Sequence, residues 1–208
     1  MTMTDDTMTV LQQANLPIKV LAYTPNKGKG TALTTGFREA LRQGFRYALT
    51  LDSDGQHKAE DIPTFAAYIA QHEDALLLGS RGLEHENMPR KNTFANRFSN
   101  FWFTVQTGKR LPDTQTGFRL YPLHKMGNMR LFTSRYEAEL ELLVFSAWRG
   151  IDIVPLPIHV YYPPAEERVS HFRPGPDFAR ISLLNTCLCF IAILYGYPSM
   201  FIRKVLKK

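Results

Sequence analysis

Apolar and polar residues follow two different periods in the first 80 residues of the chain. Short apolar, β-branched runs at residues 18–23, 47–51 and 75–80 predict strands. Between these runs, apolar residues recur every three or four positions, which is the period of a helix with one buried face. A capped helix is predicted ahead of them, over residues 1–15. This order of strands and helices predicts an α/β fold, with a mostly parallel sheet flanked by helices.

The pattern changes after residue 81. Residues 82–92 are polar and predict a loop over a site rather than a core element. An aromatic helix is predicted next, over residues 94–105, and its stripe of rings suits either the core or a lipid groove. The later predictions are an extended segment, a helix, an edge strand broken by prolines, and a loop, in that order: residues 113–120, 137–148, 151–162 and 163–176.

The end of the chain is apolar and then basic. Residues 181–202 contain no Asp, Glu, Lys or Arg, and the bases that follow are Arg203, Lys204, Lys207 and Lys208. This length suffices for a bilayer, which takes ~20 apolar residues, but several polar residues and Pro198 interrupt the stretch. An interfacial helix anchored by its basic tail and a helix packed on the domain both remain open. We divide the chain into a domain at residues 1–180 and a candidate membrane-surface anchor at residues 181–208.

Composition limits the classes of partner. The chain has 208 residues and 44% hydrophobic content, enough for one domain with a proper core. Its net charge of +6 favours anionic partners such as phosphates or acidic lipids. No nucleic-acid-binding motif accompanies that charge, so no nucleic acid partner is expected. Cys187 and Cys189 have no metal-like neighbours and are interpreted as reduced thiols, and residues 1–9 lack the apolar core of a secretory signal.

Two carboxylates one residue apart follow the strand predicted at residues 47–51. They are Asp52 and Asp54, and Gln56 and His57 come directly after the glycine that follows. Ligands of an open α/β sheet bind just outside the carboxyl ends of its strands. Carboxylates there suit a divalent cation that also holds a diphosphate. An Asp-Gly turn without a metal is the alternative, and we expect Asp52 to point into the fold and Asp54 out of it.

Other segments carry weaker signals. Residues 26–31 are glycine-rich and basic around Lys29 and open a helix, which suits a phosphate, although the spacing of a P-loop is absent. Arg81, Arg119 and Arg168 carry guanidinium forks that match phosphate oxygens. Glu139 is a candidate base if it faces the site. His57 and His171 lack the spacing of a zinc site.

Five motifs in chain order resemble those of family-2 glycosyltransferases. They are residues 26–30, 51–57, 79–81, 113–119 and 168–172. The likeness is to the branch of dolichol-phosphate and polyprenyl-phosphate mannosyltransferases, and it runs over nearly the whole chain. It implies a GT-A fold, which is Rossmann-like, and a sugar donor activated by a nucleotide diphosphate.

The resemblance also implies roles for residues. The metal ligands for Mg²⁺ or Mn²⁺ would be Asp52, Asp54 and Gln56. Binding of the donor or of phosphates would fall to Lys29, Asp52, Arg81, Arg168 and Ser170. The candidate catalytic residues are Asp113, Glu139 and Arg119. Relatives often carry lysine where His171 stands.

Two consequences follow from the resemblance. The expected function is metal-dependent, inverting transfer of a hexose to a polyprenyl phosphate, dolichyl or undecaprenyl, or to a glycan. It would take place in the cytoplasm at the inner face of the cell membrane, as part of cell-envelope synthesis.

Relatives begin with a further β-α-β unit of roughly 30 residues or more, and without it we expect an unpaired sheet edge at residues 18–23 or 47–51. The alternatives are a non-catalytic remnant that binds a membrane surface or a partner and, more remotely, an aspartyl-phosphate phosphatase.

Overall fold

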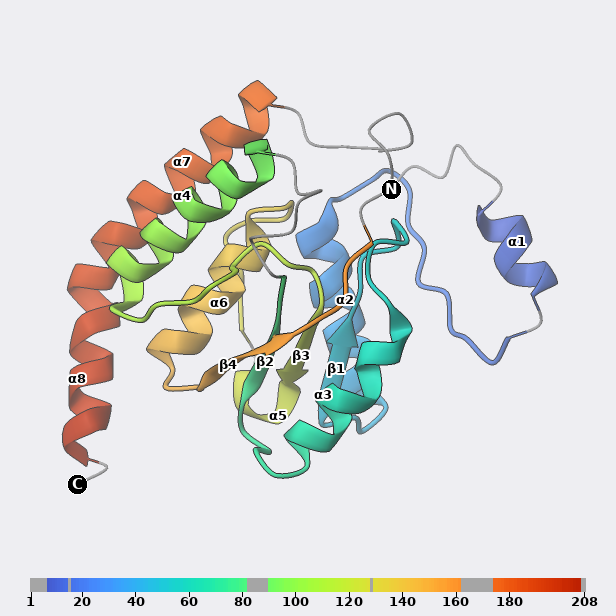
Figure 1. Ribbon diagram of the computed structural model, residues 1–208, viewed down its shortest axis with the longest axis horizontal. Helices are drawn as coiled ribbons and strands as arrows, with labels where there is room; N and C mark the ends of the chain where they lie inside the picture. Colours follow the sequence, from blue (N-terminus) through green and yellow to red (C-terminus); the bar gives the residue numbers. More distant parts are fainter. Residues whose placement is uncertain (1–6, 15, 82–89, 128, 162–173, 207–208) are drawn as a thin grey trace.

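The structure is a computed structural model, and it describes residues 7–14, 16–81, 90–127, 129–161 and 174–206. A small sheet lies at the centre, with helices on both of its faces (Figure 1). Among the described residues, its elements are α1 (Thr7–Gln13), α2 (Lys29–Arg42), β1 (Tyr47–Thr50), the 3₁₀ turn η1 (Ala59–Asp61), α3 (Ile62–Ile69), β2 (Leu76–Ser80), α4 (Arg90–Thr107), β3 (Arg119–Pro122), α5 (Leu123–Met126), α6 (Ala138–Trp148), β4 (Ile153–Pro157), α7 (Pro174–Ile191), the π-helix η3 (Ala192–Gly196) and α8 (Tyr197–Leu206).

The sheet is mixed, with strand order β1-β3-β2-β4. β3 runs antiparallel to both of its neighbours, β1 and β2, whereas β2 and β4 are parallel. Three strands therefore run in one direction, as predicted, and β3 is inserted between them in the opposite direction. The sequence predicted an extended segment at residues 113–120 but gave no direction for it, and only its last two residues belong to β3. β4 lies at one edge of the sheet, as its prolines predict.

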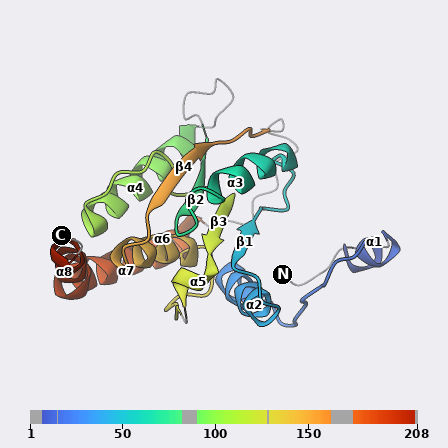
Figure 2. The same cartoon turned by 90° about the horizontal axis from the view of Figure 1, so that it is seen from below.

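The prediction of a strand at residues 18–23 is wrong. This segment is extended but unpaired, and Ile18, Val20 and Leu21 are 48%, 41% and 42% exposed. A strand needs a neighbour for its backbone groups, and the sheet formed by the described residues offers none beside this segment. β1 occupies the other edge of the sheet, and no described strand pairs with its outer side, as expected for residues 47–51. Figure 2 shows the segment leading away from the sheet to α1, which lies apart from the other helices.

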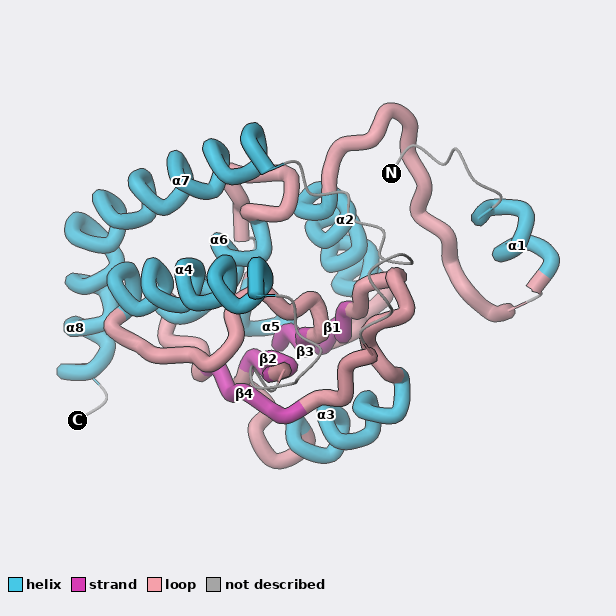
Figure 3. The backbone as a smooth tube through the Cα atoms, turned by 45° about the horizontal axis from the view of Figure 1, so that its top comes forward, coloured by secondary structure: helices cyan, strands magenta, loops and turns pink. Residues whose placement is uncertain are grey.

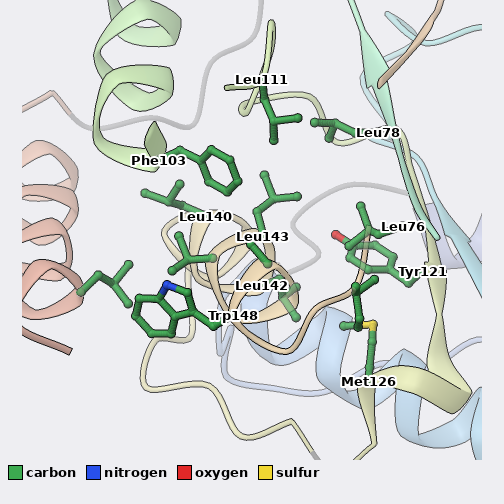
Figure 4. Close-up of a cluster of buried hydrophobic side chains, with 14 of the residues drawn as sticks. Leu76, Leu78, Phe103, Leu111, Tyr121, Met126, Leu140, Leu142, Leu143 and Trp148 are labelled. Atoms are coloured by element: carbon green, nitrogen blue, oxygen red, sulfur yellow. The ribbon is translucent and has the colours of Figure 1, made fainter. Parts of the chain in front are cut away.

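Alternating side chains divide the core into two clusters, one on each face of the sheet. Leu76, Leu78 and Tyr121 pack against α6 and its neighbours, and Figure 4 shows these side chains around Leu143. Leu77 and Leu120 point the other way, toward α3. Figure 3 shows α3 alone on that side of the strands, with α2, α4, α6 and α7 on the other. The sheet is thus buried on both faces, as predicted for an α/β fold.

α7, η3 and α8 form one continuous helical segment along the domain (Figure 1). Residues 175–206 are long and apolar enough to cross a membrane by length and composition, and 22% of the 18-residue apolar window within them is buried. Four of its buried residues form a stripe with a spacing of four: Leu184, Leu188, Ala192 and Gly196. An α-helix turns once every 3.6 residues, so residues spaced four apart shift gradually around the helix axis. The wider turn of a π-helix compensates for this rotation. The helix therefore packs on the domain and still exposes an apolar side.

Candidate active site

The loop after β1 is shaped by a glycine on a different segment. Asp52 follows β1 by two residues, and its carboxylate lies against the backbone of Gly117. A Cβ added at Gly117 would lie 2.2 Å from Asp52 Oδ2. Only glycine therefore leaves room for the carboxylate there. Asp52 is half-buried and Asp54 is exposed, which confirms the orientations expected from the sequence.

Lys29 bridges two carboxylates that are far apart in the sequence. Its Nζ lies 2.6 Å from Asp52 Oδ1 and 2.8 Å from Glu139 Oε2. Lys29 is the first residue of α2, and Glu139 lies in the first turn of α6. The two helix starts approach closely because Gly30 carries no side chain, and a Cβ there would lie 2.5 Å from the Cβ of Ala138. The structure thus joins three predicted site residues into one cluster.

The cluster of Asp52, Lys29 and Glu139 carries an excess of negative charge. Burial alone would raise the pKa of Asp52, but the neighbouring His57 imidazole and the ammonium group of Lys29 hold it well below its usual range. Burial alone would lower the pKa of Lys29, but Glu139 and Asp52 outweigh it, so the net direction is upward. Two carboxylates therefore face one ammonium group. Such a site attracts a further cation.

The donor atoms of the Asp52 loop fit Mg²⁺ or Mn²⁺. Asp54 Oδ1 accepts a hydrogen bond from the Gln56 backbone N–H at 3.0 Å, which folds the loop back on itself. Two carboxylates and an amide are hard oxygen ligands, and Mg²⁺ normally completes such sets with water and substrate phosphates. The part of the chain that is described holds no cluster of three or more His, Cys, Asp or Glu side chains suited to a metal. A cation held by this loop would complete its coordination with water and with oxygens of the substrate.

Arg81 and Asp113 were expected to have separate roles, but they pair with each other. Arg81 Nε and Nη2 donate to the two oxygens of Asp113 at 2.6 and 3.0 Å. Asn96 of α4 and the Gln115 backbone N–H also donate to this carboxylate, each at 3.0 Å. Asp113 is fully buried. The pair ties the end of β2 to α4 and the segment before β3.

Arg119 is fully buried and donates to backbone carbonyls. Its guanidinium contacts the oxygens of Thr116 at 2.7 Å, Thr114 at 3.0 Å and Glu139 at 2.7 Å. These bonds fasten the segment before β3 to the first turn of α6. Arg119 is therefore placed to hold the backbone of Glu139, and a direct catalytic contact by Arg119 stays a prediction.

Three predicted site residues, Arg168, Ser170 and His171, lie outside the described residues. His57, which the sequence places beside the two carboxylates without a role of its own, has its Nε2 3.7 Å from Asp52 Oδ2. Its side chain is almost fully buried, and its Nδ1 has no hydrogen-bond partner among the described residues. The sequence signal for this contact is Gly55, because a glycine permits a sharp turn. In the structure its φ is 74°, and the loop turns back so that His57 lies beside Asp52.

The fold and site together define a GT-A protein, with clustered carboxylates at the carboxyl end of a strand in a mixed sheet. The chain belongs to glycosyl transferase family 2, whose family profile matches residues 2–128. Among solved structures it is similar to S. aureus TarS 1–349 in complex with UDP-GlcNAc, with a TM-score of 0.55 and 18% identity over 89% of this chain and 54% of the other. Glucosyl-3-phosphoglycerate synthase from Mycobacterium tuberculosis gives a TM-score of 0.56 and 17% identity, over 89% and 65%. These two likenesses support the fold alone.

The sequence relatives are closer. A UDP-N-acetylglucosamine–dolichyl-phosphate N-acetylglucosaminyltransferase of Methanococcus voltae is 31% identical over 151 residues, which is 69% of this chain and 60% of the relative. An undecaprenyl-phosphate mannosyltransferase of Micrococcus luteus is 26% identical over 147 residues, 68% of this chain and 60% of the relative. The chain thus spans 60% of the length of these two curated relatives.

Proposed function

We propose that this chain carries the catalytic site of a metal-dependent, inverting glycosyltransferase. It would move a hexose from a nucleotide-diphosphate sugar to a polyprenyl phosphate or a glycan acceptor. The observation that carries this proposal is the cluster of Asp52, Lys29 and Glu139 at the carboxyl end of β1. The named activities of the Methanococcus and Micrococcus relatives support the lipid-phosphate acceptor.

Asp52 and Asp54 would hold the divalent cation, with Gln56 as a further ligand. When bound, the cation neutralises the charge that develops on the leaving diphosphate. Lys29, whose Nζ already lies 2.6 Å from Asp52 Oδ1, is positioned to contact a phosphate oxygen beside it. Arg168 and Ser170, which lie outside the described residues, remain proposed phosphate ligands.

The acceptor decides whether a base is needed. A polyprenyl phosphate is already ionised at neutral pH and attacks the anomeric carbon without losing a proton, whereas a sugar hydroxyl must lose one. Glu139 is the candidate for that second case, because Asp113 is fully buried and held by Arg81 and Asn96. Glu139 itself forms an ion pair with Lys29. Because an ion-paired carboxylate is a weaker base, this arrangement favours an acceptor that needs no base.

The test of this function is donor binding followed by transfer. Isothermal titration with UDP- and GDP-sugars in the presence of Mn²⁺ should show saturable binding that is lost with EDTA and in Asp52→Asn. Incubation with undecaprenyl or dolichyl phosphate in detergent should then give a sugar–phosphate–lipid with inverted anomeric configuration. The absence of donor binding at millimolar concentration would instead support the non-catalytic remnant, which no observation on the fold or the site favours.

We also propose that the protein works as a peripheral protein at the cytoplasmic face of the cell membrane. The support is the apolar side that α7, η3 and α8 expose, together with the basic residues near their end. Leu183, Phe190 and Ile193 are among the exposed apolar residues, and Arg203 and Lys204 follow them in α8. This placement is where a lipid-linked acceptor would be found.

A further inference from the structure

A pocket lies away from the candidate active site. Its volume is about 380 Å³, and its lining combines two arginines with four aromatic rings: Arg130, Arg149, Phe132, Phe145, Trp148 and Tyr195. It is formed at the carboxyl end of α6, whereas Glu139 lies nine residues earlier in the same helix. That separation is ~13 Å along the helix axis. The pocket is therefore distinct from the cluster at Asp52.

The aromatic rings form a continuous row. Phe132 meets Phe145 edge to face at a centroid distance of 5.8 Å, Phe145 contacts Trp148 at 5.5 Å, and Trp148 meets Tyr195 at 6.2 Å. The polar atom of Trp148 is already satisfied, because Nε1 donates to the Gln106 carbonyl at 2.8 Å. What the row presents to a ligand is therefore mainly apolar ring surface.

The backbone of η3 lets the C-terminal helical segment approach Trp148 closely. Tyr195 belongs to the π-helix η3, and π-helical turns are frequent at functional sites. The next residue, Gly196, lies directly on the indole, and a Cβ there would lie 2.5 Å from Trp148 Cε2. The pocket wall formed by η3 is thus built around Trp148.

The arginines supply positive charge that no carboxylate in the described part of the chain neutralises. Arg149 donates to the Met126 carbonyl, and neither Arg149 nor Arg130 forms an ion pair with a described residue. Arg203 of α8 adds a third guanidinium nearby, because its Cδ lies 3.2 Å from where a Cβ on Gly150 would be. Three basic groups from different parts of the fold therefore gather where α6 ends.

Exposed apolar side chains surround the same pocket. Phe132 is 73% exposed, and Leu194, which adjoins Tyr195 in η3, is 81% exposed. Cations beside an apolar surface match a molecule with an anionic head and a hydrocarbon tail. We propose that the pocket binds the phosphate headgroup of an anionic phospholipid in the bilayer, with the acyl chains against Phe132, Tyr195 and Leu194. This inference rests on the proposed function only in placing the protein at a membrane.

Vesicle flotation with two matched charge reversals tests the proposal. Arg130→Glu reverses a pocket arginine, and Arg38→Glu reverses an exposed arginine of α2, a helix that lies apart from α8 (Figure 1). Each basic residue at an anionic surface contributes ~1 kcal/mol, or about fivefold in binding. We expect Arg130→Glu to weaken binding to phosphatidylglycerol-containing vesicles by about tenfold or more, and Arg38→Glu by about twofold or less. Vesicles of phosphatidylcholine alone should not distinguish the two variants.

Several outcomes would overturn the proposal. An equal loss of vesicle binding in the two variants would mean that only overall charge matters. Unchanged vesicle binding in Arg130→Glu would show that the pocket does not bind the lipid. Competition by soluble glycerol phosphate at millimolar concentration would assign the pocket to a free phosphate rather than to a lipid. Thermal melts of both variants verify the fold. The flotation needs no sugar donor, so a failure here is distinguishable from a failure of donor binding in the wild-type protein.

Discussion

A single ammonium group explains why two acidic residues from different helices and loops lie together. Lys29 contacts Asp52 and Glu139 at hydrogen-bond distance, and the three side chains are only partly exposed. Without the lysine, the two carboxylates would face each other without a counter-ion. Lys29 therefore offsets the repulsion between the two carboxylates.

Lys29→Met should destabilise the protein and make it depend on a metal ion. Removing one partner of a partly buried ionic group costs about 1–3 kcal/mol, which urea denaturation measures. The variant should gain more stability from added Mn²⁺ than the wild type does, because its carboxylates lack a cation. Lys58→Met, at an exposed lysine for which the described residues offer no ion pair, is the control. Equal stability of Lys29→Met and the control would contradict this role.

Gly117→Ala should displace the Asp52 carboxylate. The added Cβ would lie 2.2 Å from Asp52 Oδ2, and overpacking of this kind costs about 1–3 kcal/mol. We expect a lower urea midpoint and weaker donor binding in the presence of Mn²⁺.

Gly36→Ala is a matched control in the interior of α2. An added Cβ there meets nothing within 4 Å, so the helix should gain about 0.5–1 kcal/mol. If both alanine variants lost stability alike, the contact at Gly117 would not be the cause.

At the scale of elements, the sequence predicts what local patterns control and misses what distant partners decide. The helices and the strands at β1 and β2 follow from periodicity, and Asp52 and Asp54 follow from their position after a strand. Residues 18–23 have the same apolar pattern as those strands, yet they stay unpaired because no described strand lies beside them. Arg81 and Asp113 pair although they are 32 positions apart, and no local sequence pattern predicts this contact.

The loop before α6 depends on one buried carboxylate. Glu141 accepts hydrogen bonds from the backbone N–H groups of Phe132 and Thr133 at 2.6 and 3.0 Å, and from the Thr133 hydroxyl at 2.6 Å. Burial raises the pKa of Glu141 above its ordinary value of 4.5, although the bonds from Thr133 and Phe132 oppose the shift. The folded protein therefore binds this proton more tightly than the unfolded chain does.

The sign of the resulting pH dependence follows from that difference. The contribution of Glu141 to the free energy of unfolding should be fully present below pH 4.5 and decline as the pH rises through the folded pKa. Urea denaturation between about pH 4 and about pH 7, in the wild type and in Glu141→Gln, isolates this contribution. The stability of the wild type relative to the variant should fall as the pH rises, and an increase would contradict the raised pKa.

At the scale of the whole molecule, charge and apolar exposure point to the same surface. The chain carries a net charge of +6, and α8 has basic residues in its last turn. The outer side of η3 and α8 is apolar, with Leu194 and Phe201 among its most exposed residues. These two features support the proposal that the protein binds an anionic membrane surface.

Replacing Leu194 and Phe201 together by glutamine should separate membrane binding from folding. Both side chains are mostly exposed, so the free energy of unfolding should change by no more than about 0.5 kcal/mol. Vesicle association should nevertheless fall several-fold, because apolar area that enters the lipid is lost. Thermal melts and vesicle flotation measure the two effects. A large loss of stability would show that these residues pack inside the protein.

The open edge of β1 links assembly to chemistry. Asp52 comes only two residues after Thr50, the last residue of β1. Any extended chain that hydrogen-bonds along this edge would stiffen the backbone from which the carboxylate projects. Pairing of β1 with a second copy of the chain, or with another partner, would therefore change the mobility of the loop that carries Asp52.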